Sequence, residues 1–253
     1  DLGKPHMELP YKCIYDAPNT INVFTDGSWL HPKNFVYSLG GAGVWWPSRK
    51  LTKHPLSSAE KELAHCFPCD TGVRIATSIG GFSGSSTRTE LAAGILAMCA
   101  HGPVHIGSDS EVFINQANLF KDLLQNEKPI KINFQLISDG DLWNHFVLAL
   151  KAKRPQAVKF TWVKGHADDT HISKGITTLA NKIGNDIADE TADIGTSLHG
   201  KETMSLAQLF YERYCEYTKF MFLIVKHIVE AHCIHRELLR IKEAKEDRQL
   251  VHA

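Results

Sequence analysis

The sequence predicts a mixed α/β fold: a five-stranded sheet whose first three strands are antiparallel, flanked by helices and followed by a C-terminal helical extension. Three observations favour it. Short runs rich in β-branched and aromatic residues alternate with longer runs of helical periodicity. The first three strand-like runs follow one another with no strong helical pattern between them, as antiparallel strands do. The residues from 199 onward carry only a helical pattern.

Five segments have the composition of strands. The first, 21–26, is apolar and stops at the turn signal Gly27-Ser28. The second, 37–46, contains three glycines, which indicate a bulge or the close approach of another backbone. The remaining strands are expected at 73–79, 104–107 and 158–163.

Helical periodicity predicts four helices in the same part of the chain, and two polar stretches interrupt the pattern. The helices are expected at 87–101, 111–124, 139–153 and 185–194, with Asp139 as the N-cap of the third. The polar stretches, 48–70 and 167–184, are interpreted as loop-like inserts.

These elements divide the chain into an arm (1–20), an α/β domain (21–198) and a helical extension (199–253). In the extension, apolar residues recur every three or four positions over 203–246, which predicts one long amphipathic helix or two packed ones. We expect this face to dock against the domain or a partner. The apolar run 220–229 contains Lys226 and is too short to cross a bilayer, so no membrane association is expected.

Composition sets few limits on function. The 253 residues include 28 Lys and Arg and 28 Asp and Glu, so zero net charge neither indicates nor excludes a nucleic-acid partner. Six scattered cysteines and an N-terminal stretch unlike a signal peptide predict an intracellular protein, nuclear or cytoplasmic. Cys66 and Cys69, near His54 and His65, could form half a zinc site. Because no second cysteine pair follows, they are interpreted as reduced thiols.

Four carboxylates lie at or near the ends of predicted elements: Asp26, Glu90, Asp109 and Asp189. A carboxylate in an apolar run is costly without a partner or cation. Four of them together suit Mg²⁺, and two such ions about 4 Å apart can promote phosphodiester cleavage. Asp186 is the rival for the fourth position, but Asp189 shares a helix face with Asn185, four residues away, and is favoured.

Five motifs that contain these acids occur in a characteristic order. Together they resemble a type 1 ribonuclease H domain over residues 21–195; the motifs are Thr25-Asp26-Gly27-Ser28, Arg88-Thr89-Glu90-Leu91, Ser108-Asp109-Ser110, Trp162-Val163-Lys164-Gly165-His166 and Gly184-Asn185-(x)₃-Asp189. The long inserts are similar to those of domains attached to retroelement reverse transcriptases, which makes a reverse transcriptase domain a possible partner.

The resemblance implies the fold, the reaction and the roles of several residues. It implies a ribonuclease H-like sheet and hydrolysis of the RNA strand of an RNA–DNA hybrid, leaving 5′-phosphate and 3′-hydroxyl ends. The cofactor would be two Mg²⁺ ions, with Mn²⁺ able to substitute. The four carboxylates match the family's metal ligands, and His166 matches its mobile-loop histidine, which can exchange protons near neutral pH.

The resemblance also suggests which residues contact the hybrid, and here the chain departs from bacterial members. The candidates lie near the metal ligands or in a basic region of the third helix: Ser28, Ser86, Thr87, Arg88, Asn185, Lys151 and Lys153. The segment before Glu90 lacks the asparagines with which bacterial members read the RNA 2′-hydroxyl. The insert 167–184 also separates His166 from Asn185.

Three other functions are compatible with the same motifs. A DNA strand transferase of the superfamily would take its last carboxylate from a late helical Glu, whereas here the Glu is on the first helix. An inactivated hybrid-binding domain is disfavoured because all four acids are present. A domain that works only beside a polymerase domain fits the appended helices.

Overall fold

The computed structural model describes the chain except residues 1–7, 32–36, 70, 81–84 and 252–253, and leaves the side chains of 246–251 undescribed. The chain forms two compact units, one ending at Ser205 and one beginning at Leu206. The first unit holds the sheet and its helices, and the second consists of helix alone.

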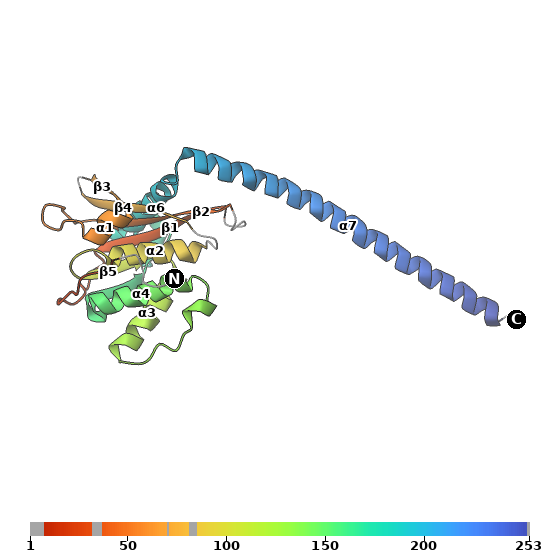
Figure 1. Ribbon diagram of the computed structural model, residues 1–253, viewed down its shortest axis with the longest axis horizontal. Helices are drawn as coiled ribbons and strands as arrows, with labels where there is room; N and C mark the ends of the chain where they lie inside the picture. Colours follow the sequence, from red (N-terminus) through yellow and green to blue (C-terminus); the bar gives the residue numbers. More distant parts are fainter. Residues whose placement is uncertain (1–7, 32–36, 70, 81–84, 252–253) are drawn as a thin grey trace. The chain divides into compact units, whose positions relative to one another are not determined.

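The sheet of the first unit has six strands in the described residues, in the order β3-β4-β2-β1-β5-β6 (Figure 1). β1 pairs antiparallel with β2, β2 antiparallel with β4, and β1–β5 and β5–β6 are parallel. The strands are β1 Val23–Leu30, β2 Leu39–Trp46, β3 His65–Cys69, β4 Gly72–Ile79, β5 Val104–Ser108 and β6 Val158–Trp162. The mixed sheet and the three antiparallel strands, which are β1, β2 and β4, are therefore confirmed.

The predicted count of five strands was wrong by one. The additional strand, β3, lies inside the 48–70 insert and pairs antiparallel with β4 at the edge of the sheet. It carries Pro68, and proline is tolerated on an edge strand but weakens the sequence signal for a strand. The same insert contains α1 (Ser58–Leu63), whose capping box joins Ser57 and Glu60. A buried ion pair between Arg49 and Glu60 joins the start of the insert to α1.

Helices cover both faces of the sheet. The main core lies between one face and the helices α2 (Ser86–Met98), α3 (Glu111–Gln125) and α4 (Gly140–Lys153). Side chains alternate along β1, so Val23 joins this core while Phe24 points to the other face, where it packs with Ala188 of α6 (Leu179–Ser197). Short 3₁₀ turns, η1 (Phe134–Leu136) and η2 (Pro155–Ala157), precede and follow α4.

The glycines of β2 let α6 lie directly on the sheet. A Cβ atom at Gly41 would lie 2.1 Å from the backbone nitrogen of Thr196, and one at Gly43 would lie 2.2 Å from that of Ala192. This contact explains the expected close approach of another backbone at β2. It also fixes the helix that carries the fourth acidic residue, Asp189.

The second polar insert is also more ordered than expected. It contains α5 (Asp169–Ser173), and α6 begins at Leu179 rather than at residue 185. Thr178 caps α6 by accepting a hydrogen bond from the backbone of Asn181. The early start of α6 means that its first six residues lie in the stretch interpreted as an insert.

The C-terminal pattern forms one helix rather than two. This helix, α7, runs from Lys201 to Val251, and most of it lies in the second unit. Among the described residues, no helix is long and apolar enough to cross a membrane.

Candidate active site

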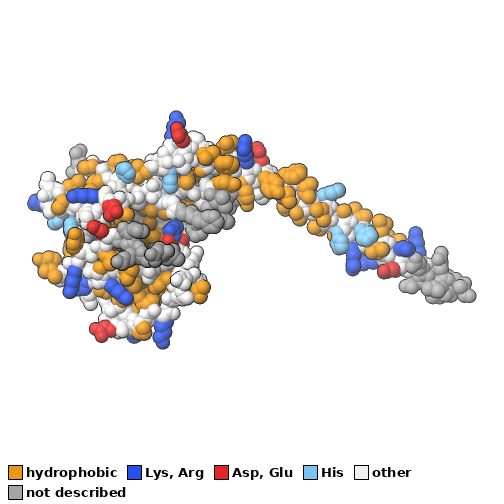
Figure 2. All heavy atoms as spheres, in the orientation of Figure 1, with side chains coloured by type: hydrophobic (Ala, Val, Ile, Leu, Met, Phe, Trp, Pro, Cys, Tyr) orange, Lys and Arg blue, Asp and Glu red, His pale blue; other side chains and the backbone are white. Residues whose placement is uncertain are grey.

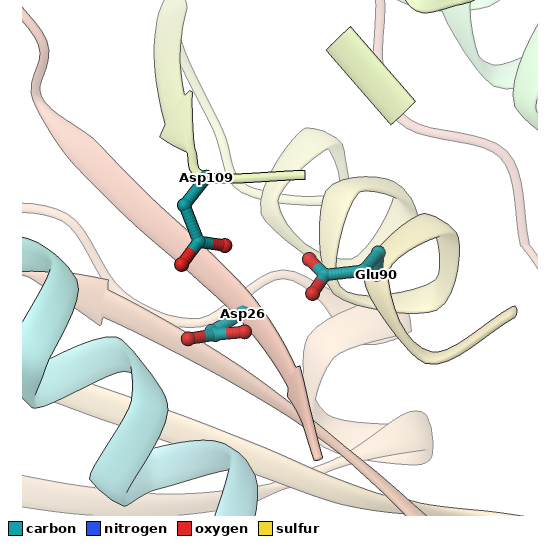
Figure 3. A group of neighbouring side chains, drawn as sticks. All are labelled: Asp26, Glu90 and Asp109. Atoms are coloured by element: carbon teal, nitrogen blue, oxygen red, sulfur yellow. The ribbon is translucent and has the colours of Figure 1, made fainter. Parts of the chain in front are cut away.

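Three of the four predicted acids meet beside the neighbouring strands β1 and β5. Asp26, Glu90 and Asp109 each place a carboxylate oxygen within 4.8 Å of the others, and Figure 3 shows them converging from β1, α2 and the end of β5. β1 and β5 are parallel neighbours with Phe24 opposite Gly107. Asp26 and Asp109 each lie two residues beyond that pair, so the strand register brings the two carboxylates together.

A glycine brings the third acid to the sheet. A Cβ atom at Gly27 would lie 2.5 Å from the backbone nitrogen of Glu90, so only glycine lets the start of α2 pack this closely on β1. The Gly27 amide also donates a hydrogen bond of 2.6 Å to Asp26 Oδ1. Behind the group, the Ser108 hydroxyl donates to Glu90 Oε2 at 3.4 Å.

The three acids are buried or half-buried, and the electrostatics suit a bound cation. Burial and the neighbouring Asp109 carboxylate raise the pKa of Asp26 to about 7. Burial, followed by the charges of Asp26 and Asp109, raises the pKa of Glu90 well above its usual value. Three oxygen donors whose ionised forms repel one another form a set that a hard divalent cation would stabilise. The residues present therefore fit the divalent metal implied by the sequence.

Asp109 is held in place from three sides. Asn185 Nδ2 donates to its Oδ2 atom at 3.3 Å, and Trp162 Nε1 donates to its backbone carbonyl at 3.0 Å. Gly165 lies against the same carboxylate, since a Cβ atom there would be 2.1 Å from Oδ2. The motifs around Gly165 and Asn185 thus support Asp109, a function that no sequence pattern had indicated.

Asp189 lies outside the group of three but belongs to the same electrostatic environment. It is half-buried on α6, one turn after Asn185. Burial and the nearby Asp193 raise its pKa, whereas His166 acts in the opposite direction. The rival, Asp186, forms an ion pair of 2.5 Å with Lys182. This pairing favours Asp189 over Asp186 as the acid that completes the site.

His166 is exposed and has a positive φ of 46°. It follows Gly165 in the segment between β6 and α5. The next segment is ordered by Asp168, which caps α5 and contacts His171 Nδ1 at 2.6 Å. His166 therefore lies in solvent, next to the backbone that contacts Asp109.

Several candidates for contact with a nucleic acid are engaged in the protein's own interactions. The Ser28 hydroxyl donates to Asp193 at 2.6 Å. Arg88 forms two hydrogen bonds of 2.8 and 2.7 Å with Asp141 and lies 3.5 Å from Asp139. Asp139 precedes α4 but does not cap it with its side chain; instead it accepts a hydrogen bond from Ser85. These contacts connect the first turns of α2 and α4.

The remaining candidates differ in exposure. Ser86 and Lys151 are exposed and Thr87 is half-buried, so all three remain open to a ligand. Asn185 is only 2% exposed and faces Asp109. Lys153 is fully buried, donates to the carbonyl of Ala100, and has a pKa lowered by burial to about 8. The prediction that Lys153 contacts phosphate was wrong, because helical periodicity turns it into the core while Lys151 faces solvent.

The cysteine pair in the insert does not belong to a group of metal-ligating side chains within the described part of the chain. Cys66 and Cys69 are three residues apart on strand β3, so their side chains point to opposite faces. Among the described residues, the only group of acid, histidine and cysteine side chains close enough to hold a metal is Asp26, Glu90 and Asp109. The interpretation of these cysteines as free thiols holds.

Comparison with known proteins places this site in a family. The model of the RNase H family matches residues 18–197, and no curated protein matches. The type 1 enzyme LC9-RNase H1 is 18% identical, with 72% of this chain and 74% of that chain covered and a TM-score of 0.42. The PFV RNase H domain is 20% identical, with 70% and 93% covered and a TM-score of 0.42.

A larger protein is also similar. The protease–reverse transcriptase of prototype foamy virus is 17% identical, with 76% of this chain but 23% of that chain covered and a TM-score of 0.45. The family model alone spans well over half of this chain, including all four predicted acids. The chain belongs to the RNase H family.

Proposed function

We propose that this ribonuclease H is an endonuclease that hydrolyses the RNA strand of RNA–DNA hybrids through two divalent metal ions, leaving 5′-phosphate and 3′-hydroxyl ends. The observation that carries the proposal is the convergence of Asp26, Glu90 and Asp109 within 4.8 Å, with raised pKa values at the two buried acids. A purely structural group of acids would be expected to have a cationic side chain among its partners.

The acids would hold the metal ions, and Mg²⁺ is the expected species, with Mn²⁺ able to substitute. Asp26, Glu90 and Asp109 would hold the ions, and Asp189 would complete the set of ligands. When bound, two such ions supply an activated water and stabilise the leaving oxygen of the phosphodiester. The apolar core beneath β1 and β5 keeps Asp26 and Asp109 at fixed positions, so the site is organised before substrate binds.

The chain's other residues would position the ligands and move protons. Asn185 and Gly165 confine Oδ2 of Asp109, which fixes the orientation of that carboxylate. His166, exposed and beside Asp189, would give a proton to the leaving oxygen or assist release of the product. Its place in the segment between β6 and α5 gives it room to approach a bound phosphate.

Recognition of the hybrid would depend on its backbone rather than its bases. Ser86 and Thr87 at the start of α2 lie two or more residues before Glu90 and remain open to a sugar or phosphate. Lys151 on α4 would contact a phosphate further along the duplex. The 2′-hydroxyl distinguishes the RNA strand from the DNA strand at such a surface.

The direct test is cleavage of a hybrid whose RNA strand carries a 5′ label. We expect cutting with Mg²⁺ or Mn²⁺, none with chelator, and none of the same strand as single-stranded or duplex RNA. Product ends are checked by sensitivity to phosphatase and by ligation. Tight hybrid binding without cutting in either metal would contradict the proposal and indicate a hybrid-binding domain that is inactive or requires a partner such as a reverse transcriptase.

A further inference from the structure

The second unit has a surface that the nuclease function does not use. Helix α7 carries exposed apolar side chains from Leu206 to Ile241, a span of 36 residues or about 54 Å at the helical rise. Figure 2 shows apolar atoms along much of its length. The described part of this unit is a single helix, so no second element within it covers these side chains.

The apolar residues follow a heptad repeat. From Tyr214 to Leu238, positions a and d are occupied in turn by Tyr214, Tyr217, Met221, Ile224, Ile228, Ala231, His235 and Leu238. We name these eight residues the α7 seam. The f positions, opposite the seam, are Glu212, Lys219, Lys226, Cys233 and Arg240, of which four are charged. A spacing of alternately three and four residues is what keeps one face of a helix against another helix over several turns.

Some charged residues of α7 form ion pairs along the surface of the helix. Lys226 lies 3.8 Å from Glu230, and Arg240 lies 3.6 Å from Glu237. The seam residues Tyr217 and Ile228 are each 60% exposed. Exposed apolar side chains such as these gain more from burial than exposed charged ones do.

The length of α7 and the residues beside the seam indicate what covers the seam. The longest other described helix, α6, has 19 residues, about 28 Å, and already packs on the sheet. A second copy of α7 supplies a helix of matching length. In a parallel, in-register pair, each g position meets the e position of the next heptad, which gives Phe220 with Val225, His227 with His232 and Ile234 with Leu239. Each pair matches apolar with apolar or histidine with histidine.

We propose that α7 mediates parallel self-association of this protein through the α7 seam. The apolar e and g residues widen the contact beyond a and d, which allows more than two copies to assemble. Self-association would join two or more copies of the chain, each with its own nuclease unit. The inference is independent of the proposed cleavage reaction.

Mass measurement on the full chain tests the proposal. Light scattering after gel filtration at about 1 to 100 µM is expected to give a mass of two or more chains. Ile228→Asp should raise the dissociation constant by about 100-fold or more, because association would bury a charged carboxylate of each helix in the seam, away from water. The matched control is Cys233→Asp, which introduces the same charged side chain at an f position and should leave the mass unchanged.

A cysteine at the seam tests the parallel orientation. Ile224→Cys should form a disulfide-linked dimer under mild oxidation, because a parallel register places the two copies of residue 224 side by side. The unsubstituted protein, with its native Cys233 on the opposite face, should not. A monomer across the whole concentration range, or equal effects of Ile228→Asp and Cys233→Asp, would overturn self-association through the seam. An assembly that Ile224→Cys does not cross-link would overturn the parallel arrangement.

Discussion

Two groups of acids lie near the start of α2, and only one of them is paired with a cationic side chain. Asp139 and Asp141 share the guanidinium of Arg88, and that contact is the main cause of the lowered pKa of Asp141. Asp26 and Glu90 have raised pKa values, caused first by burial and then by carboxylates of the same group. The same helix therefore supports one acid group that is neutralised by the protein and one that is not.

The difference explains why the two groups have different functions. An acid paired with arginine holds two helices together and has little affinity left for another cation. Acids that converge without such a partner keep their oxygens available and gain stability from a metal ion. Five changes test whether the two acid groups differ in this way.

Replacing Asp109 should have the largest effect. Asp109→Asn keeps the shape of the side chain but removes a charged metal ligand, so cleavage of the hybrid should fall by about 1000-fold or more. Because the change also removes repulsion with Asp26, the melting temperature without metal should not fall. Circular dichroism melts and cleavage rates measured on the same preparation check both points. Activity near that of the unsubstituted protein would exclude Asp109 as a ligand.

The contact of Gly165 with Asp109 gives the next largest effect. In Gly165→Ala the new methyl group would lie 2.1 Å from Oδ2 of Asp109, so the carboxylate must move by about 1 Å. A displacement of that size can lower the cleavage rate by about 100-fold. Gly80→Ala is the control, because no atom lies within 4 Å of its Cβ position. Equal rates for the two variants would show that Asp109 tolerates displacement.

Asn185 should act through Asp109 rather than through the substrate. Asn185→Ala removes the hydrogen bond to Oδ2 and should lower the rate about 10- to 100-fold, as losses of groups that orient a metal ligand do. The metal concentration for half-maximal activity should rise, while the dissociation constant of the hybrid in chelator should stay the same. A change in hybrid binding alone would instead assign Asn185 to the substrate. Asn144→Ala, an exposed change on α4, is the control.

Removing the arginine converts the neutralised acid group into one without a cation. Arg88→Ala leaves Asp139, whose side chain is 3% exposed, with only Ser85 as a described partner, and should cost about 1 to 3 kcal/mol of unfolding free energy. Lys151→Ala, at an exposed position, should cost much less. Chemical denaturation measures both. If hybrid affinity falls with no loss of stability, Arg88 contacts nucleic acid rather than holding α2 to α4.

The sequence was most informative where a residue type is unusual in its position and few arrangements explain it. Asp26, Glu90, Asp109 and Asp189 were predicted as a group because carboxylates at the ends of elements are costly without a cation, and the first three do converge. The glycines of β2 predicted a close backbone contact, which α6 provides. In both cases the sequence contains residues that are unfavourable by themselves, either carboxylates among apolar residues or glycines within a strand. The fold offsets that cost by bringing the carboxylates together and by packing a helix on the glycines.

It was least informative where several roles share one residue type. Lys153 and Lys151 look alike in the sequence, but one is buried against Ala100 and the other is exposed. Arg88 was a candidate for contact with the hybrid, and its ion pair with Asp141, 53 residues away, cannot be recognised from spacing. Strand β3 was missed because edge strands need little apolar patterning. Tertiary contacts decide these cases.

The smallest expected effect is that of Asp26 on the pH dependence of stability. The folded pKa of Asp26 is about 7, above its unfolded value of about 3.9, so the folded state binds the extra proton between these values. Without metal, Asp26 should therefore lower the free energy of unfolding progressively as pH rises from about 4 to about 7. His105 and His145, whose pKa values are lowered by burial, act in the opposite direction near pH 6, so the total slope is mixed.

Comparison with Asp26→Asn cancels the contribution of the two histidines, so the difference reports Asp26 together with its interaction with Glu90. In chelator, the melting temperature of Asp26→Asn should rise relative to that of the unsubstituted protein by a few degrees between pH 4 and pH 7. Saturating Mg²⁺ at pH 7 should reverse the order, because only the unsubstituted protein keeps the full set of ligands. A difference that does not change with pH would mean that Asp26 is neutralised by the protein, as Asp141 is by Arg88, and would remove the contrast between the two acid groups.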